Sequence, residues 1–265
     1  MKNYSFSIKN LFYSQSERYF CKNSKFRELI KNKRVALVGP ANYLTLFNWG
    51  KIIDNYDIVA RINRGIELID NHKNALGTRT DILYNCLIEK SDNGGVISLR
   101  NLKKNNVKWV CSQLHSDVDG NVFKNRLHPE VKFLTILKLR YFLNLHIHEY
   151  KNYSFLNRQL KCRANTGFSA IFDLLDNDAK EVFVSGFSFY LDSFIKGYKK
   201  GSKMDEEEFA KNCFNSKRHN QKNQWNYLKS IKNNPKLTFD PILNEVLNLN
   251  SLEKKEFLII LKKYI

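Results

Sequence analysis

The segment from Arg163 to Tyr190 carries the side chains best suited to chemistry. It opens with a basic residue, passes through Thr166 and Gly167 into an apolar helix, and continues into an apolar strand that ends at Gly186. A polar residue and a glycine at the start of a helix leave backbone N–H groups that can hold a phosphate. Ligands of open α/β sheets collect at the carboxyl ends of the strands. The segment alone therefore predicts a nucleotide-type site on an α/β sheet.

An upstream block shows a similar order of strands and turns. Residues 35–38 and 58–62 are nearly continuous apolar runs, as expected of parallel strands that are buried on both faces. Gly39 ends the first run, and a glycine there lets the backbone turn and approach a ligand. The sequence GTRTD at residues 77–81 opens a third strand. The upstream block therefore adds three strands to the predicted sheet.

Two asparagines stand at the ends of these strands. Asn63 follows the second strand and Asn85 follows the third. Each side chain offers a donor and an acceptor, which suit a cytosine edge, a ribose hydroxyl or a phosphate. A single asparagine after a strand is more often a turn residue. Together with Gly39, they make three strand ends with small or polar residues, which favours a binding site.

The remaining elements follow from apolar patterning. Strands are predicted at 107–112, 131–136 and 237–239, and helices near 166–176, 220–232 and 241–248.

The two blocks, in this order, resemble the sialyltransferases over roughly residues 34–231. The upstream block is similar to their large sialylmotif and the segment from Arg163 to Tyr190 to their small one, both of which bind CMP-sialic acid in that superfamily. In size and ending the chain resembles the small bacterial members. The resemblance implies an α/β fold: a Rossmann-like, mostly parallel sheet flanked by helices, in one GT-A-like domain without a metal site.

The resemblance also implies donor-binding residues. Positions matching Asn63 and Asn85 contact the nucleotide or the sugar, and those matching Arg163 and Thr166 lie against the sugar carboxylate. Arg163 would then be a bidentate clamp, the alternative being a surface ion pair. The full predicted donor-binding set is Gly39, Asn42, Asn63, Asn85, Arg163, Thr166, Gly167 and Gly186.

The first turn departs from the family pattern. Pro40 follows Gly39, where families with a Gly-Asn turn place an asparagine, and Asn42 comes two residues later. Either Asn42 substitutes for that asparagine or the contact is absent. This departure leaves the donor sugar open, whereas the expected nucleotide is CMP.

His219 stands where these enzymes carry a catalytic histidine that heads a helix. A histidine at a helix start has its pKa lowered by the helix dipole and can act as a neutral general base. The basic, poorly patterned segment 202–218 before it indicates a mobile lid. Gln224 stands where the animal-type motif usually has a glutamate, so this position offers no carboxylate to orient the histidine.

Two tyrosines complete the predicted catalytic set. The sequence from Gly186 to Tyr190 resembles the family's Gly-x-x-Phe-Tyr, in which the tyrosine hydrogen-bonds the departing phosphate. Tyr198 is a candidate for a second such hydroxyl, with a buried aromatic residue as the equal alternative. Neutral phenols can stabilise charge on a leaving CMP without a metal ion.

The sequence thus predicts an inverting glycosyltransferase that moves sialic acid from CMP-sialic acid to a hydroxyl of a surface glycan, of lipooligosaccharide or capsule type. No cofactor and no metal are expected. Kdo or another CMP-linked keto-acid sugar is an alternative donor. The non-enzyme alternatives are a nucleic-acid-binding protein and an inactive homologue that binds glycans or nucleotides. Asp117 and Asp119 resemble a metal-binding Asp-x-Asp, but Gly120 and Asn121 follow them and favour an Asx turn.

The composition and net charge of the chain limit which classes of partner it can bind. The chain has 265 residues, 43% of them hydrophobic, and a net charge of +18. Such a charge fits nucleic acid or an anionic membrane surface. Because the lysines are scattered and no zinc, RRM or helix-turn-helix pattern appears, no nucleic acid partner is expected. Five cysteines without a CxxC pair favour a reducing cytoplasm.

The ends of the chain suggest where it works. Residues 1–33 form a basic lead-in, 34–250 the catalytic domain and 251–265 a basic amphipathic segment. No signal peptide and no membrane span are evident, so we expect a cytoplasmic protein. The last segment suits peripheral contact with an anionic inner membrane, near a lipid-linked acceptor. A terminal helix packed on the catalytic domain is the equal alternative, and the oligomeric state stays open.

Overall fold

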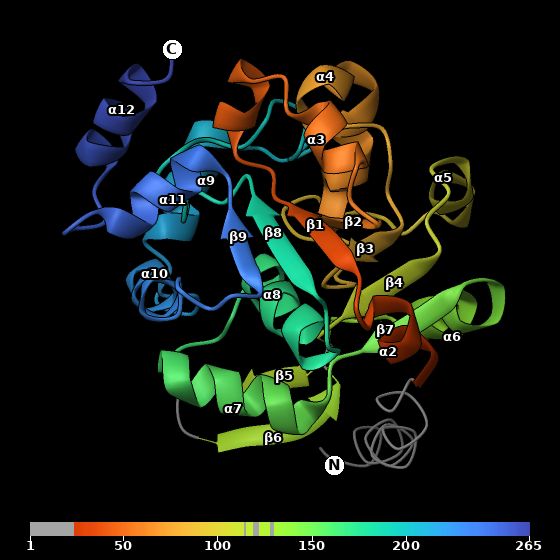
Figure 1. Cartoon of the computed structure of the whole chain (residues 1–265). Coiled ribbons are helices and arrows are strands. Elements are labelled where there is room, and N and C mark those ends of the chain that lie inside the picture. Colours follow the sequence, from red (N-terminus) through yellow and green to blue (C-terminus); the bar gives the residue numbers. More distant parts are fainter. Residues whose placement is uncertain (1–23, 114, 119–121, 128–129) are drawn as a thin grey trace.

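The fold is a seven-stranded parallel sheet flanked by helices (Figure 1). The computed structural model describes residues 24–265 except 114, 119–121 and 128–129. The sheet contains β1 (Arg34–Val38), β2 (Ile58–Ile62), β3 (Ile82–Tyr84), β4 (Trp109–Ser112), β7 (Asn144–Ile147), β8 (Glu181–Ser185) and β9 (Leu237–Phe239). A separate antiparallel pair consists of β5 (His115–Val118) and β6 (Val122–Leu127).

The helices connect and cover these strands. They are α2 (Ser24–Ile30), α3 (Gly50–Asp54), α4 (Lys73–Leu76), α5 (Leu99–Lys104), α6 (Phe133–Phe142), α7 (Tyr150–Leu160), α8 (Thr166–Asp176), α9 (Glu206–Phe214), α10 (Gln221–Ser230), α11 (Pro241–Asn248) and α12 (Lys254–Lys262). Two 3-10 helices, η1 (Asn42–Leu46) and η2 (Asn63–Asn71), follow β1 and β2. The Rossmann-like α/β architecture expected from the sequence is confirmed.

The strand order creates a crevice in the middle of the sheet. It runs β7-β4-β3-β2-β1-β8-β9, so the chain builds outward from β1 through β2, β3 and β4 before it returns to add β8 on the other side of β1. The connections after β1 and β8 therefore leave in opposite directions. In open α/β sheets such a switch point is where ligands bind, at the carboxyl ends of the strands.

The two central strands show why apolar runs predicted a parallel sheet. All five residues of β2 are buried, as are the last four of β1. Helices on both faces leave no solvent-facing side, so the alternation of polar and apolar residues disappears.

The predicted strand at 131–136 is wrong. This stretch enters α6, which begins at Phe133 and continues to Phe142. A short apolar run does not distinguish a strand from a helix, and Lys138 and Arg140 obscured the continuation. The sequence also gave no prediction for β7, whose four residues Asn144–Ile147 alternate polar and apolar side chains at the edge of the sheet.

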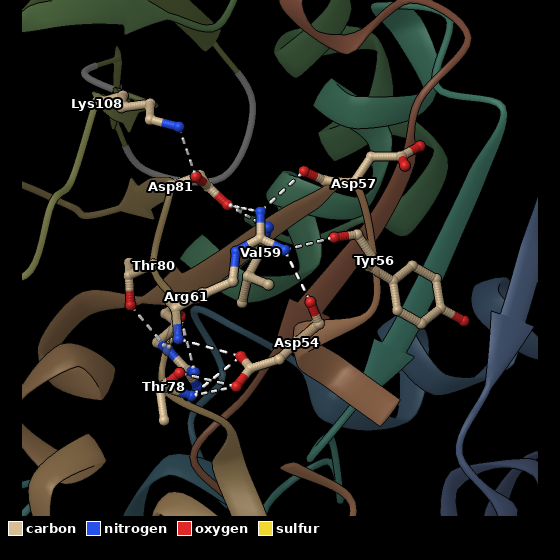
Figure 2. A network of polar contacts seen from close by, with 10 residues as sticks. Asp54, Tyr56, Asp57, Val59, Arg61, Thr78, Thr80, Asp81 and Lys108 are labelled. Atoms are coloured by element: carbon tan, nitrogen blue, oxygen red, sulfur yellow. Dashed lines mark hydrogen bonds and ion pairs between the residues drawn. The ribbon is translucent and has the colours of Figure 1, made fainter. Parts of the chain in front are cut away.

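The GTRTD sequence lies at the amino ends of β2 and β3, opposite the carboxyl ends of the strands (Figure 2). Arg79 donates to the carbonyl oxygens of Asp54, Tyr56 and Asp57 at 2.8, 2.8 and 3.0 Å. It also donates to the carboxylate of Asp81 at 3.0 Å. One guanidinium group therefore provides hydrogen-bond donors for three carbonyl oxygens of the turn that leads into β2.

Asp81, directly before β3, belongs to the same network. Its carboxylate accepts from the Val59 amide and from the Lys108 ammonium, both at 3.0 Å (Figure 2). These contacts tie the start of β3 to β2 and to the residue before β4. The sequence GTRTD thus holds strand ends together and does not reach the crevice.

The predicted lead-in and C-terminal segments both contact the core where they are described. Residues 1–23 lie outside the described part. Phe26 of α2 stacks on His146 with ring centroids 3.9 Å apart. In α12, Phe257 and Ile260 are 1% and 2% exposed, whereas Leu258 and Ile259 are 47% and 53% exposed. Within the described residues, no helix combines the length and apolar character needed to cross a membrane.

Candidate active site

A cavity of about 260 Å³ opens at the carboxyl ends of the sheet. Its wall comes from residues that follow β1, β2, β3, β4 and β8, from the start of α8, and from the segment that leads to α10. The predicted site residues on this wall are Asn63, Arg163, Thr166, Gly167, Gly186, Tyr190, Tyr198 and His219. The fold therefore collects most of the predicted side chains at the switch point.

Gly39 and Gly186 shape the floor where the turns after β1 and β8 meet. A Cβ atom on Gly39 would collide with the carbonyl oxygen of Gly186, and Gly186 has a φ of +77°. The Gly186 amide donates to the carboxylate of Asp240 at 2.9 Å. Burial raises the pKa of Asp240. Gly39 thus allows the two turns to approach, while Pro40 supplies the cavity wall.

The start of α8 presents polar backbone to the cavity. Asn165, rather than Thr166, caps the helix, and its Oδ1 accepts from the Phe168 amide at 2.8 Å. The Thr166 hydroxyl accepts from Nε2 of Gln113 at 2.8 Å. In the described part of the chain, the amides of Thr166 and Gly167 donate to no acceptor. They are placed to bind a ligand oxygen.

Arg163 lies on the wall and is only 9% exposed. Its Nε donates to the Tyr153 hydroxyl at 3.2 Å, and its backbone amide donates to the Arg218 carbonyl at 3.1 Å. These contacts orient the guanidinium group beside the start of α8. A planar guanidinium in that position suits a carboxylate, and the predicted clamp stays a prediction.

The ring of His219 is held by a backbone carbonyl. Its Nδ1 lies 2.9 Å from the carbonyl oxygen of Arg163, and since a carbonyl only accepts, Nδ1 carries the proton. Nε2 is then the basic nitrogen. Burial lowers the pKa of His219 to about 4, with smaller contributions from the charges of Arg163 and Arg218. The pKa of His219 is lowered, as expected from the sequence, but the largest cause is burial and not the helix dipole.

Gln224 acts on the backbone of His219 and not on its ring. Its Nε2 donates to the His219 carbonyl at 3.2 Å, and its Oε1 accepts from the Asn165 amide at 3.3 Å. The side chain is fully buried. It therefore joins the starts of α8 and α10, and the carbonyl of Arg163, not a carboxylate, orients the ring of His219.

The rings of the two predicted tyrosines both contact the ring of Phe194, which lies between them in the sequence. The Phe194 ring is 5.5 Å from that of Tyr190 and 5.0 Å from that of Tyr198, with which it stacks. Burial raises the pKa of both phenols, so they stay neutral donors. Phe189 and Tyr190 have φ values of +51° and +62°, a costly conformation for such residues. The strained turn places the Tyr190 side chain on the cavity wall.

The three predicted asparagines have different positions. Asn63 lines the cavity, with a φ of +47°, and its Oδ1 accepts from the Cys86 amide at 3.1 Å. Asn85 is off the wall: its Nδ2 donates to the Gly94 carbonyl at 2.9 Å and its Oδ1 accepts from the Leu87 amide at 2.7 Å. Asn42 begins η1, also off the wall. Donor contacts from Asn42 and Asn85 stay predictions, and Asn85 anchors the loop after β3.

The polar wall residues that the sequence did not predict include Gln113 and Lys199. Gln113 follows β4, is 5% exposed, and its Oε1 has no hydrogen-bond partner in the described part of the chain. Lys199 is 7% exposed, and its ammonium donates to the Asp92 carbonyl at 2.8 Å. A polar residue directly after an apolar strand could have indicated Gln113. Lys199 follows Tyr198 among many other lysines and gave no signal.

The predicted lid contains an ordered helix. Residues 202–218 include α9, whose cap is Asp205: its Oδ1 accepts from the Glu208 amide at 2.8 Å. Three glutamates in the first turn interact favourably with the positive end of the helix dipole and so stabilise the helix. Phe209 and Cys213 of α9 line the cavity. The segment thus builds part of the wall.

A second cavity, of about 320 Å³, lies between α7, α8 and β7. It contains a buried group in which His146 Nε2 is 2.9 Å from Asp173, which also accepts from the Tyr84 hydroxyl at 2.8 Å. Charged and hydrogen-bonding partners lower the pKa of Asp173 to about 2 despite burial, which acts in the opposite direction. None of the predicted site residues lies there.

Metal ligands are not gathered in the described part of the chain. Among the described side chains, no group of three or more His, Cys, Asp or Glu residues could hold a metal ion. The side chain of Asp117 and the whole of Asp119 lie outside the described residues.

The fold is similar to those of solved sialyltransferases. The enzyme CstII from Campylobacter jejuni, in complex with the substrate analogue CMP-3FNeuAc, is 16% identical, with 78% of this chain and 80% of that chain covered and a TM-score of 0.50. A mammalian sialyltransferase in complex with Gal-beta-1-3GalNAc-ortho-nitrophenol is also 16% identical, with 86% and 78% covered and a TM-score of 0.44. No protein-family model and no curated protein matches the sequence. The likeness to CstII supports a sialyltransferase-type fold.

Proposed function

We propose that this protein is a glycosyltransferase that moves sialic acid from CMP-sialic acid to a hydroxyl of a surface glycan. The observation that carries the proposal is the meeting of His219, Arg163, Tyr190 and Tyr198 in one cavity at the switch point of the sheet. The sialylmotif-like blocks and the fold shared with CstII support the same activity. The CstII complex contains the substrate analogue CMP-3FNeuAc.

The side chains suit a single displacement with inversion. His219 Nε2 takes the proton of the acceptor hydroxyl while the acceptor oxygen bonds to the anomeric carbon of the sugar. The bond from that carbon to the phosphate oxygen breaks, and its electron pair stays on CMP. Tyr190 and Tyr198 donate hydrogen bonds to the charge that develops there, and Arg163 holds the sugar carboxylate.

The direct test supplies donors to the full chain. CMP release should occur with CMP-Neu5Ac and should rise when glycan acceptors of lipooligosaccharide or capsule type are added. CMP-Kdo is the second donor, because Kdo carries the same carboxylate and the same leaving group. Faster release with CMP-Kdo would reassign the donor. Binding of CMP without turnover of either donor would indicate an inactive homologue.

Metal removal gives an independent prediction. Because neutral phenols occupy the proposed phosphate end, activity should be unchanged after dialysis against EDTA. The measurement is the rate of CMP release before and after chelation. Loss of activity that Mn²⁺ restores would contradict the proposal and would assign a role to Asp117 and Asp119.

A further inference from the structure

Lys199 is a buried cation on the wall of the proposed donor site. The side chain is 7% exposed, and its ammonium donates to the carbonyl oxygen of Asp92 at 2.8 Å. Among the described residues, no carboxylate forms an ion pair with it. A buried charge that forms no ion pair is costly, so its retention calls for a partner.

Aromatic rings surround the ammonium group. Its Nζ lies 4.2 Å from the ring centroid of Phe209 on α9, 5.3 Å from that of Tyr198 and 5.6 Å from that of Phe194. Ring faces stabilise a cation and hold it in place, but they do not neutralise it. The contact with Tyr198 puts the charge beside one of the two phenols assigned to the leaving group.

We propose that Lys199 binds the phosphate of CMP, next to Tyr198. This inference rests on the proposed function, because it assigns a further partner to the same donor. A lysine ammonium is a compact charge that suits phosphate, whereas the planar guanidinium of Arg163 suits the sugar carboxylate. The donor's two anionic groups would then meet two different cations on one wall. As the bond to the sugar breaks, Lys199 stabilises the negative charge on the phosphate and transfers no proton.

Because the pKa of Lys199 is lowered, its contact with the phosphate can be tested by varying the pH. Burial lowers this pKa to about 8. The other groups that face it are Asp92, Arg64 and the thiols of Cys86 and Cys213. Burial raises the pKa of both thiols, that of Cys213 to about 11, so both ionise at a higher pH than an ordinary thiol. The phosphate of CMP is already ionised above pH 7, since its second pKa is about 6.

The first experiment compares ligands that do and do not carry phosphate. Calorimetry at pH 7 would give the affinities of CMP, cytidine and free N-acetylneuraminate for the wild type, Lys199→Met and a control, Lys196→Met, whose side chain is exposed. Lys199→Met should weaken CMP binding about 10- to 100-fold, the usual worth of a hydrogen bond to a charged group, and leave cytidine unchanged. The control should bind all three ligands as the wild type does.

Three outcomes would overturn the assignment. Unchanged CMP affinity in Lys199→Met would remove Lys199 from the donor site, although the proposed function would stand. Equal losses for CMP and cytidine would show that Lys199 only shapes the pocket, and a loss confined to N-acetylneuraminate would move it to the carboxylate. A wild type that binds neither CMP nor cytidine would instead refute the proposed function itself.

The second experiment needs no Lys199→Met protein, in case that variant fails to fold. Wild-type affinity for CMP should fall as pH rises from 7 to 9.5, because deprotonation of Lys199 removes the charge. Lys199→Arg should show no such fall, since arginine stays charged. A pH-independent affinity in the wild type would overturn the proposal.

Discussion

At His219, burial and one backbone hydrogen bond act on the same ring. The Arg163 carbonyl places the proton on Nδ1, and burial keeps the ring neutral with a pKa of about 4. Both effects leave Nε2 as an acceptor at neutral pH. The residue therefore has the protonation state of a general base without a carboxylate partner.

Removal of this imidazole should affect turnover far more than donor binding. For His219→Ala we expect kcat to fall about 10²- to 10⁴-fold, the usual contribution of a positioned base, while CMP still binds. Steady-state kinetics and calorimetry measure the two effects. His72→Ala is the control, since His72 lies away from the cavity and its side chain caps no helix. Near-normal turnover in His219→Ala would exclude His219 as the base.

The pH dependence of kcat/KM follows from the same residue. A base must be unprotonated, so activity should be lost as pH falls through the pKa of the free enzyme, which is about 4. The profile should be flat between pH 5 and 7. An ordinary histidine would give an acid limb near 6.5, and a limb at that value, absent in His219→Ala, would contradict the proposed burial of the ring.

Single residues also mark the limit of what the sequence could predict. Arg163, Tyr190 and His219 were predicted because each has a distinctive neighbourhood in the chain, and all three line the cavity. Asn85 stands in an equally suggestive position, yet both ends of its amide are used by Gly94 and Leu87. The proposed role of Lys199 depends on its contact with the ring of Phe209, which forms only when the chain folds. Such roles depend on long-range packing and have no local pattern.

At the scale of elements, prediction succeeded where pattern and cap agreed. The predicted helix at 166–176 corresponds to α8, and that at 241–248 to α11, which has Asp240 as its cap and a proline in its first turn. The stretch 131–136 failed because its apolar residues fit either period. In α9, only Ala210 is buried, so the apolar stripe was too weak to detect.

The network around Arg79 gives a prediction at this scale. Arg79→Met would leave three carbonyl oxygens at the start of β2 without this donor, so the free energy of unfolding should fall by about 1–3 kcal/mol. Chemical denaturation measures the loss, with Arg100→Met on the exposed face of α5 as the control. CMP affinity of the folded variant should be normal. Lost CMP affinity with normal stability would instead place GTRTD in the donor site.

At the scale of the whole molecule, the charge of +18 and the end of the chain bear on location. The packed-helix and membrane alternatives for residues 251–265 use different faces of α12. Phe257 and Ile260 face the core, and the Phe257 ring is 6.1 Å from that of Tyr43. Leu258 and Ile259 are exposed on the same helix. One helix can therefore pack on the domain and still present an apolar face.

The lysines of α12 and its end are partly engaged. Lys254, Lys255 and Lys263 pair with Glu207, Glu253 and Glu245, respectively. Each of these lysines is more than half exposed, and such surface pairs contribute little. Anionic lipid can replace the glutamates, since each basic residue near such a surface contributes about 1 kcal/mol.

We therefore expect the full chain to sediment with anionic vesicles at low salt, and less so at high salt or with neutral vesicles. A double variant, Leu258→Asp with Ile259→Asp, should weaken sedimentation without unfolding the domain, because both side chains are exposed. Ile52→Asp on α3 is the matched control, with a side chain 54% exposed and outside the C-terminal segment. A chain ending at Asn250 removes the whole segment, but it also removes Phe257 and Ile260 from the core. Equal sedimentation of the wild type and the double variant would show that the exposed face of α12 does not bind the membrane.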